Sequence, residues 1–117
     1  YAACPTYFTA DDHNSMGYAY YKTLQYEKSK VSYRRAMAME PKNLIFVRML
    51  GVVYIAQSDW QGLKEIATNG LAVNSNDAFC NKFYAIALDN TGQGNLAAEY
   101  HQKAERMEKE EKSRNNN

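Results

Sequence analysis

The stretch LGVVY at residues 50–54 decides the fold, because related stretches stand at equal spacing on both sides of it. MGYAY begins 34 residues earlier, at residue 16, and YAIAL begins 34 residues later, at residue 84. In each stretch a small residue follows a large apolar one, and a second large apolar residue stands three positions further on. Self-similarity at a fixed period of this length is the signature of a repeat array. The sequence therefore predicts one structural unit written three times.

Each unit is expected to contain two helices, because its apolar residues recur at helical spacing and are interrupted once. In the second unit the first helix covers residues 44–55. Ser58 and Asp59 then break the pattern, and the second helix covers residues 60–73. The other units are expected to be helical over residues 11–24, 27–39, 77–90 and 95–114.

The small residue at the repeated position has a mechanical explanation. Gly17 and Gly51 fall in the middle of predicted helices, where glycine costs about 1 kcal/mol relative to alanine. Ala85 holds the same position in the third unit. A sequence that places glycine twice at one phase is expected to need close contact between helices there.

The pattern resembles the tetratricopeptide repeat, whose 34-residue signature is W-x2-L-G-x2-Y, then A-x3-F, then P. Residues 50–54 match the central block, Ser29 with Tyr33 stands in the A-x3-F positions of the first unit, and Pro41 stands in the proline position. The resemblance implies an all-α fold, an α-α superhelix (solenoid) of three helix-turn-helix repeats. The sequence departs from the signature at Ser75, Lys109, Ala67 and His101.

The register of the repeats divides the chain into segments. A leader at residues 1–9 is either a cap over the first helix or the end of an upstream segment. A polar tail at residues 112–117 is expected to be disordered. Between them lie the repeats at residues 10–43, 44–77 and 78–111.

Composition fits a globular domain and singles out no anionic partner. The chain has 117 residues, 45% of them hydrophobic, and a formal net charge of +1. No apolar run approaches the length of a membrane span. Basic residues gather in the second predicted helix, where a solvated face is the favoured interpretation. Weak binding of RNA or an acidic surface is the alternative, through Lys28, Lys30, Arg34 and Arg35.

The sequence contains no recognisable catalytic or metal-binding pattern. His13 and His101 have no cysteine or acidic partner at metal-ligand spacing, and Asp11 and Asp12 are better explained as N-cap acceptors of the first helix. Cys80 stands among apolar residues and is expected to be a small core residue. We therefore expect no enzyme, no cofactor, no metal site and no small-molecule substrate.

In proteins of the resembled family, the first helices of successive repeats line a concave groove that holds a peptide. A chaperone-tail receptor of this family clamps a terminal carboxylate with Lys, Asn and Arg side chains. The positions of that clamp hold Asn14, Tyr18, Met49, Phe79 and Phe83 here, so the clamp is missing. The groove implied by the resemblance is apolar and aromatic, with Arg48 and Lys82 as its cations. Its residues are Asn14, Tyr18, Tyr21, Lys22, Ile45, Arg48, Val52, Ile55, Phe79, Lys82, Ile86 and Asp89.

These features favour a non-enzymatic scaffold for protein–protein interaction, chaperone- or adaptor-like, which binds an apolar or amphipathic peptide segment. The alternative is a structural segment of a larger assembly that docks through its terminal helices, including an oligomer formed through the C-terminal helix. No targeting signal is visible, so a cytoplasmic location is the default. A bacterial envelope lipoprotein is the alternative if Cys4, which follows Tyr-Ala-Ala, is lipidated.

Overall fold

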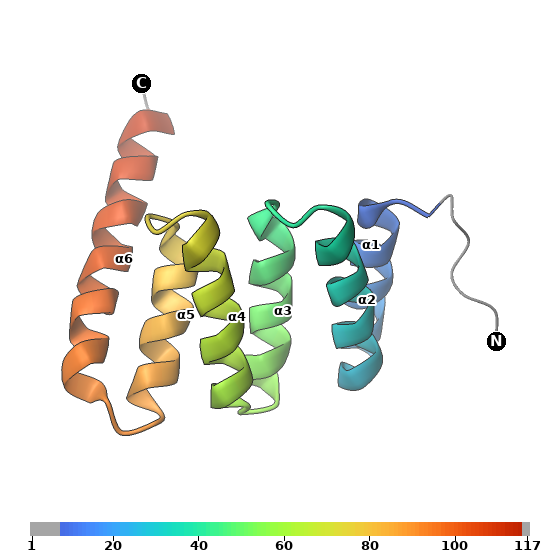
Figure 1. The fold of residues 1–117 in the computed structure, drawn as a ribbon, viewed down its shortest axis with the longest axis horizontal. Helices are drawn as coiled ribbons and strands as arrows, with labels where there is room; N and C mark the ends of the chain where they lie inside the picture. The colour runs from blue at the N-terminus through green and yellow to red at the C-terminus, as the bar shows by residue number, and fades with distance from the viewer. Residues whose placement is uncertain (1–7, 116–117) are drawn as a thin grey trace. The chain divides into compact units, whose positions relative to one another are not determined.

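The computed structural model describes residues 8–115, which form six α-helices and no strand (Figure 1). The chain folds as two compact units, one ending at Val53 and one beginning at Tyr54. The all-α prediction is confirmed. The helices are α1 (Ala10–Lys22), α2 (Tyr26–Met39), α3 (Leu44–Ala56), α4 (Trp60–Val73), α5 (Ala78–Asp89) and α6 (Gly94–Asn115).

In the first unit, α1 and α2 approach each other closely at Gly17. A Cβ atom at Gly17 would lie 2.6 Å from Cε1 of Tyr33, whose ring is fully buried. The hydroxyl of Ser29 donates a hydrogen bond of 2.7 Å to the carbonyl of Gly17. The close helix contact expected at this glycine is therefore present. The residues that contact Gly17 are Ser29 and Tyr33, which stand in the A-x3-F positions of the first repeat.

The start of α3 completes the core of the first unit. Phe46 is buried together with Ala10 of α1 and Ala36 of α2, and the partly buried Met37 packs against this cluster. Small residues on the two helices of the first hairpin leave room for the aromatic ring of the next one.

In the second unit, α4 lies close to the end of α3 at a glycine that the repeat pattern did not predict as a contact point. A Cβ atom at Gly62 of α4 would overlap the ring of Tyr54, which is buried near the end of α3. Further along, the rings of Tyr84 in α5 and Tyr100 in α6 meet edge to face, with centroids 4.6 Å apart. Leu63 and Leu88 are fully buried in this unit.

Side chains cap the helices at their N-termini. Thr9, not Asp11, is the N-cap of α1: Asp12 N–H donates to the Thr9 hydroxyl, and Thr9 N–H donates to the Asp12 carboxylate at 2.8 Å. This hydrogen bond lowers the pKa of Asp12. Asp12 therefore supplies an acceptor at the start of the helix as expected, and both Asp11 and Asp12 lie in its first turn, but the N-cap residue itself is Thr9. Asp59 and Asp77 cap α4 and α5.

The turn inside each repeat has the same backbone geometry. Leu24, Ser58 and Gly92 all have positive φ angles, of 63°, 53° and 81°, and they stand 34 residues apart. In each case the next backbone N–H donates to a carbonyl five residues earlier, at 2.8, 2.9 and 2.9 Å. The turns that join repeats also match, because residues 43 and 77 donate to the carbonyls of residues 40 and 74.

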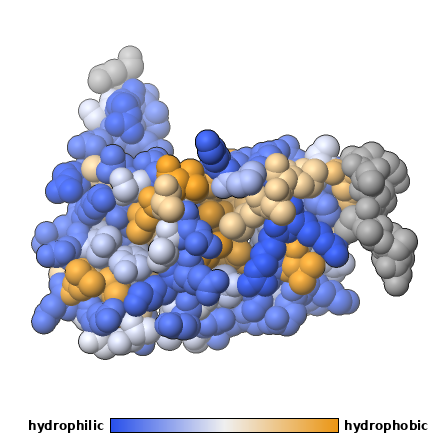
Figure 2. All heavy atoms as spheres, viewed as in Figure 1, coloured by the Kyte–Doolittle hydropathy of each residue, from blue (hydrophilic) through white to orange (hydrophobic). Residues whose placement is uncertain are grey.

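The last helix extends into the segment that was expected to be a disordered tail. α6 continues to Asn115, so residues 112–115 are helical where the sequence suggested a disordered tail, and residues 116–117 lie outside the described part. Figure 2 shows hydrophilic atoms over its last turns. Pairs of opposite charge four residues apart, Glu108 with Lys112 and Glu110 with Arg114, favour helix in this segment, as do the basic residues in its last turn.

The buried Tyr33 predicts a loss of stability in strong alkali. Burial raises the pKa of its hydroxyl from 10.0 to about 12, against the opposing effect of the Ser29 hydroxyl. Between these values the unfolded chain holds fewer protons than the folded one, so the free energy of unfolding falls as the pH rises. Denaturant unfolding from about pH 8 to about pH 12 should show a steeper fall for the parent than for Tyr33→Phe. Equal slopes would show that Tyr33 is not the group responsible.

Candidate peptide-binding surface

The positions proposed for the groove recur on each helix at a spacing that puts them on one side. On α3 these are residues 45, 48, 52 and 55, and on α5 they are residues 79, 82, 86 and 89. Steps of three and four residues keep side chains on a single helical face. Residues 14, 18 and 21 hold the corresponding places on α1. We call these the groove stripes of α1, α3 and α5.

The groove stripe of α3 contains two exposed aliphatic residues. The helix is almost entirely apolar in sequence, and Phe46, Val47 and Leu50 are buried on its other faces. Ile45 nevertheless remains 50% exposed and Val52 39% exposed. A helix that is apolar all round is normally buried all round. The first unit therefore presents aliphatic surface that its own core does not use.

The groove stripe of α1 contains an exposed aromatic ring, and Lys22, which was also predicted for the groove, places its cation beside that ring. Tyr18 is 48% exposed, and the ammonium group of Lys22 lies 5.9 Å from the centre of its ring. Tyr21 is half-buried, and its ring centroid lies 6.0 Å from that of Tyr26 in α2. Tyr21 therefore contributes to the packing of its own hairpin as well as to the surface.

Two polar residues of these stripes in the first unit are only partly accessible to a binding partner. Asn14 and Arg48 are both half-buried. The side-chain oxygen of Asn14 is covered and accepts no hydrogen bond from the residues that the structure describes. Of the two cations predicted for the groove, Arg48 is thus the less accessible, because Lys82 is exposed.

The groove stripe of α5 begins with an exposed aromatic ring that packs against a buried one. Phe79 is 45% exposed, and its ring meets that of the buried Phe83 at a centroid distance of 6.3 Å. Ile86 is half-buried, as is Ile55 at the end of α3. An exposed aromatic ring held by a packed neighbour is suited to contact with a partner, because little side-chain freedom is lost on binding.

The last helix adds polar groups beside the α5 stripe, which were not among the residues predicted for the candidate site. His101 Nε2 lies 2.7 Å from a carboxylate oxygen of Asp89, so Asp89 is engaged within its own hairpin. A hollow of about 250 Å³ is lined by Lys82, His101, Ala104, Glu105 and Glu108. Lys82 therefore stands beside carboxylates of α6. The spacing of Glu105 and Glu108 on one helical face was the available signal.

The basic helix α2 does not form a continuous exposed cationic stripe. Lys30 is 8% exposed and makes an ion pair of 3.0 Å with Glu27. The ammonium group of Lys28 lies 5.8 Å from the centre of the Tyr20 ring. Lys28 and Lys30, which were considered for RNA or acidic surfaces, are therefore engaged within the hairpin.

In residues 8–115 no group of three or more His, Cys, Asp or Glu side chains is placed to hold a metal ion. Cys80 is fully buried in the second unit, as predicted for a core residue, and Cys4 lies outside the described range. Within the same range, the helices lack the combined length and apolarity that crossing a membrane requires.

Comparison with solved structures identifies the fold. MamA matches with a TM-score of 0.80 and 17% identity over 90% of this chain, which spans 61% of the MamA chain. The second TPR of Spaghetti (RPAP3), bound to the HSP90 peptide SRMEEVD, matches with a TM-score of 0.77 and 15% identity, covering 85% of this chain and 92% of that one.

The Sgt2 TPR domain from Aspergillus fumigatus matches with a TM-score of 0.77 and 21% identity over 85% of this chain and 66% of that one. No family model matches the sequence. No curated protein matches it either. At these identities the similarity establishes the fold, and together with the 34-residue register and the repeated hairpin turns it shows that this chain has the tetratricopeptide-repeat fold.

Proposed function

We propose that this chain is a non-enzymatic scaffold that binds an apolar or amphipathic peptide segment through the exposed apolar residues of the groove stripes of α1 and α3 in the first unit. The observation that carries the proposal is the exposed aliphatic surface of α3, where Ile45 and Val52 remain accessible although the helix already buries its other faces. Apolar surface that the core leaves uncovered marks a site of interaction. Tyr18 adds an exposed ring at the corresponding place on α1, and in the second unit Phe79 presents an exposed ring on α5.

The chemistry of these stripes favours a partner different from the acidic tail peptide seen with the Spaghetti domains. Phe79 and Phe83 stand at clamp positions of the resembled receptor, where cationic and amide side chains would hold a terminal carboxylate. Lys82 is exposed, and its ammonium group would meet an acidic side chain or a backbone carbonyl of the bound segment. The proposed ligand is thus a mainly apolar segment with few acidic groups, as an adaptor or chaperone would hold.

Fluorescence anisotropy with a panel of short amphipathic peptides tests this proposal. The double substitution Ile45→Asp with Val52→Asp should weaken binding of the best peptide at least tenfold, about 1.4 kcal/mol, because it places two carboxylates in the apolar stripe. Met39→Asp is the matched control: Met39 is 49% exposed, close to the 50% of Ile45, but lies on α2. Binding by this control should stay within about twofold of the parent.

Two outcomes would contradict the proposal. Equal losses in the double variant and in the control would mean that general surface hydrophobicity causes binding. Tighter binding of SRMEEVD than of any amphipathic peptide would mean that the chain reads an acidic terminus without the expected clamp. Circular dichroism melts of each variant would verify that the fold is retained.

A further inference from the structure

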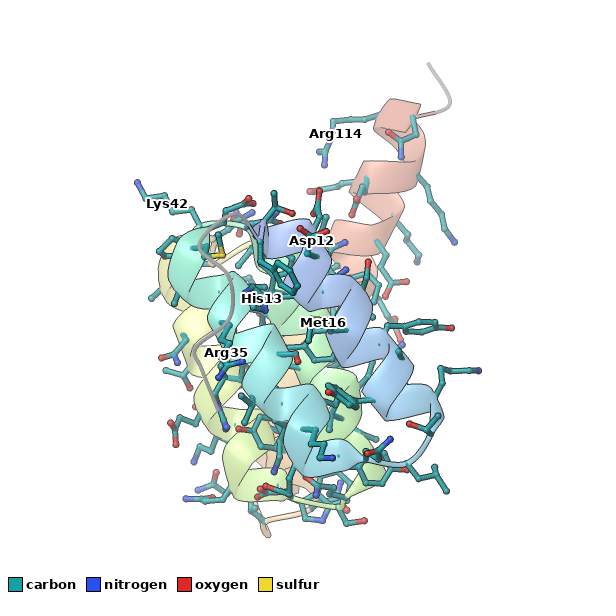
Figure 3. The ribbon with its side chains drawn as sticks, turned by 90° about the vertical axis from the view of Figure 1, so that its right-hand side faces the viewer. Asp12, His13, Met16, Arg35, Lys42 and Arg114 are labelled. Atoms are coloured by element: carbon teal, nitrogen blue, oxygen red, sulfur yellow. The ribbon has the colours of Figure 1, made fainter. Side chains whose placement is uncertain are left out.

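The turn between α1 and α2 carries a leucine that the stability of the fold does not explain. The turn lies at the opposite end of the first hairpin from Asp12 (Figure 3). Leu24 has a φ angle of 63°, where a Cβ atom is disfavoured, and Gly92 holds the same place in the third repeat. The Leu24 side chain is 72% exposed, well above the 50% of Ile45. Glycine would relieve the backbone and remove this exposed apolar surface, so the leucine indicates a role in binding.

Hydrogen bonds hold this turn in one conformation. The backbone N–H of Leu24 donates to the carbonyl of Tyr21 at 3.0 Å. The backbone N–H of Gln25 donates to the carbonyl of Tyr20 at 2.8 Å, and the Gln25 side-chain amide donates to the Thr23 hydroxyl at 2.8 Å. Because the turn is already ordered, little chain freedom is lost when Leu24 contacts another surface.

The residues around Leu24 are positively charged. We call residues 22–28 the hairpin tip. Lys22 and Lys28 are both exposed. The acidic residue of the tip is Glu27, and Lys30 neutralises it through an ion pair of 3.0 Å. The charge of the two exposed lysines is therefore not offset within the tip, and it is suited to an anionic surface.

Tyrosine rings surround these two lysines. Their ammonium groups lie 5.9 and 5.8 Å from the ring centres of Tyr18 and Tyr20, a contact in which each cation keeps its charge. The rings of Tyr21 and Tyr26 lie beside each other, with centroids 6.0 Å apart. Tyrosine joins an apolar ring to a polar hydroxyl, so it is suited to the boundary between water and the hydrocarbon of a bilayer.

We propose that the hairpin tip docks on the surface of an anionic lipid bilayer. Leu24 inserts among the first carbons of the acyl chains, and Lys22 and Lys28 lie at the lipid phosphates. A single leucine supplies little of the roughly 800 Å² that each partner buries in a stable protein interface, whereas a bilayer takes up individual side chains. One inserted side chain and two cations give weak, reversible binding. Leu24 lies outside the groove stripes, so this docking is independent of the proposed peptide binding.

Vesicle flotation tests the proposal, with phosphatidylcholine vesicles that contain or lack phosphatidylglycerol. The parent should bind the anionic vesicles at least about fivefold more tightly than the neutral ones. Leu24→Gly should lower binding to the anionic vesicles at least about fivefold, because the inserted side chain is lost. The same variant should unfold at a higher denaturant concentration than the parent, since the left-handed backbone no longer carries a Cβ atom.

Ser58→Gly is the matched control. Ser58 holds the same left-handed place in the second repeat, with a φ angle of 53°, so its replacement should also raise the denaturant midpoint. Binding of this control to anionic vesicles should equal that of the parent. Equal binding by Leu24→Gly and the parent would overturn the proposal, as would a parent that does not bind anionic vesicles.

Lys28→Gln separates insertion from attraction by charge. It should weaken binding to anionic vesicles about threefold and leave any binding to neutral vesicles unchanged. Binding that depends on Lys28 but not on Leu24 would mean that charge alone is recognised, and it would overturn the insertion of Leu24. Saturable binding of a protein that requires Leu24, with no binding to vesicles, would assign the tip to a protein partner instead.

Discussion

Asn81→Asp is expected to lower the free energy of unfolding by about 3–5 kcal/mol at pH 7, the largest effect of any single substitution considered. Asn81 is fully buried, and its side-chain amide donates to the carbonyls of Asp77 at 2.8 Å and Ser75 at 3.1 Å. The substitution keeps the shape but turns a donor into a charged acceptor that faces two carbonyl oxygens. Denaturant unfolding of parent and variant measures the difference.

The pH dependence and an exposed counterpart sharpen this prediction. Burial would raise the pKa of the new carboxyl in the folded state. The loss of unfolding free energy is therefore greatest at neutral pH. It shrinks as the pH falls toward the pKa that the carboxyl has in the unfolded chain. Asn90 makes the same kind of bond, from its amide to the carbonyl of Ile86 at 2.8 Å, but it is exposed. Asn90→Asp should therefore cost no more than about 1 kcal/mol. Equal losses of unfolding free energy at the two sites would show that the burial of the Asn81 hydrogen bonds is not the cause.

Gly17→Leu is expected to lower the free energy of unfolding by about 3 kcal/mol, because added atoms must displace the fully buried ring of Tyr33. Leucine is the better helix former by about 1 kcal/mol, so the steric term must exceed that gain. Gly94→Leu is the matched control, since a Cβ atom at Gly94 meets nothing within 4 Å. Thermal and denaturant melts should show a destabilised Gly17 variant and a Gly94 variant at least as stable as the parent.

Much of this fold can be predicted from the sequence, because the same helical pattern occurs in each of the three repeats. The 34-residue register locates every helix, and it marks Gly17 as a point of close approach before its partner Tyr33 is seen. α4 begins at Trp60 and ends at Val73 as predicted, since Asp59 caps it and Asn74 ends it. Apolar periodicity indicates the buried face of an amphipathic helix such as α4, but not that of α3, which is apolar almost all round.

The structural details that could not be predicted from the sequence are contacts between residues that hold different positions within the repeat. The packing of Tyr54 on Gly62 follows from the geometry of the turn between them, and the Thr9 cap depends on a reciprocal bond with Asp12. The engagement of Asp89 by His101 joins two helices across a turn. For the candidate site, residue type indicated the groove stripes, but only the packing shows that Ile45 is open and Arg48 half-buried.

The matching turns described for the repeats have a consequence for how such a chain can change in length. Both kinds of turn recur at the same place with the same hydrogen bonds, although their residues differ: leucine, serine and glycine all occupy the left-handed position. The hairpin, rather than the turn residue, imposes the conformation. An in-frame duplication or deletion of 34 codons would therefore join helices through backbone geometry that the chain already adopts. Recombination within such a gene can add or remove whole units while the joints remain foldable.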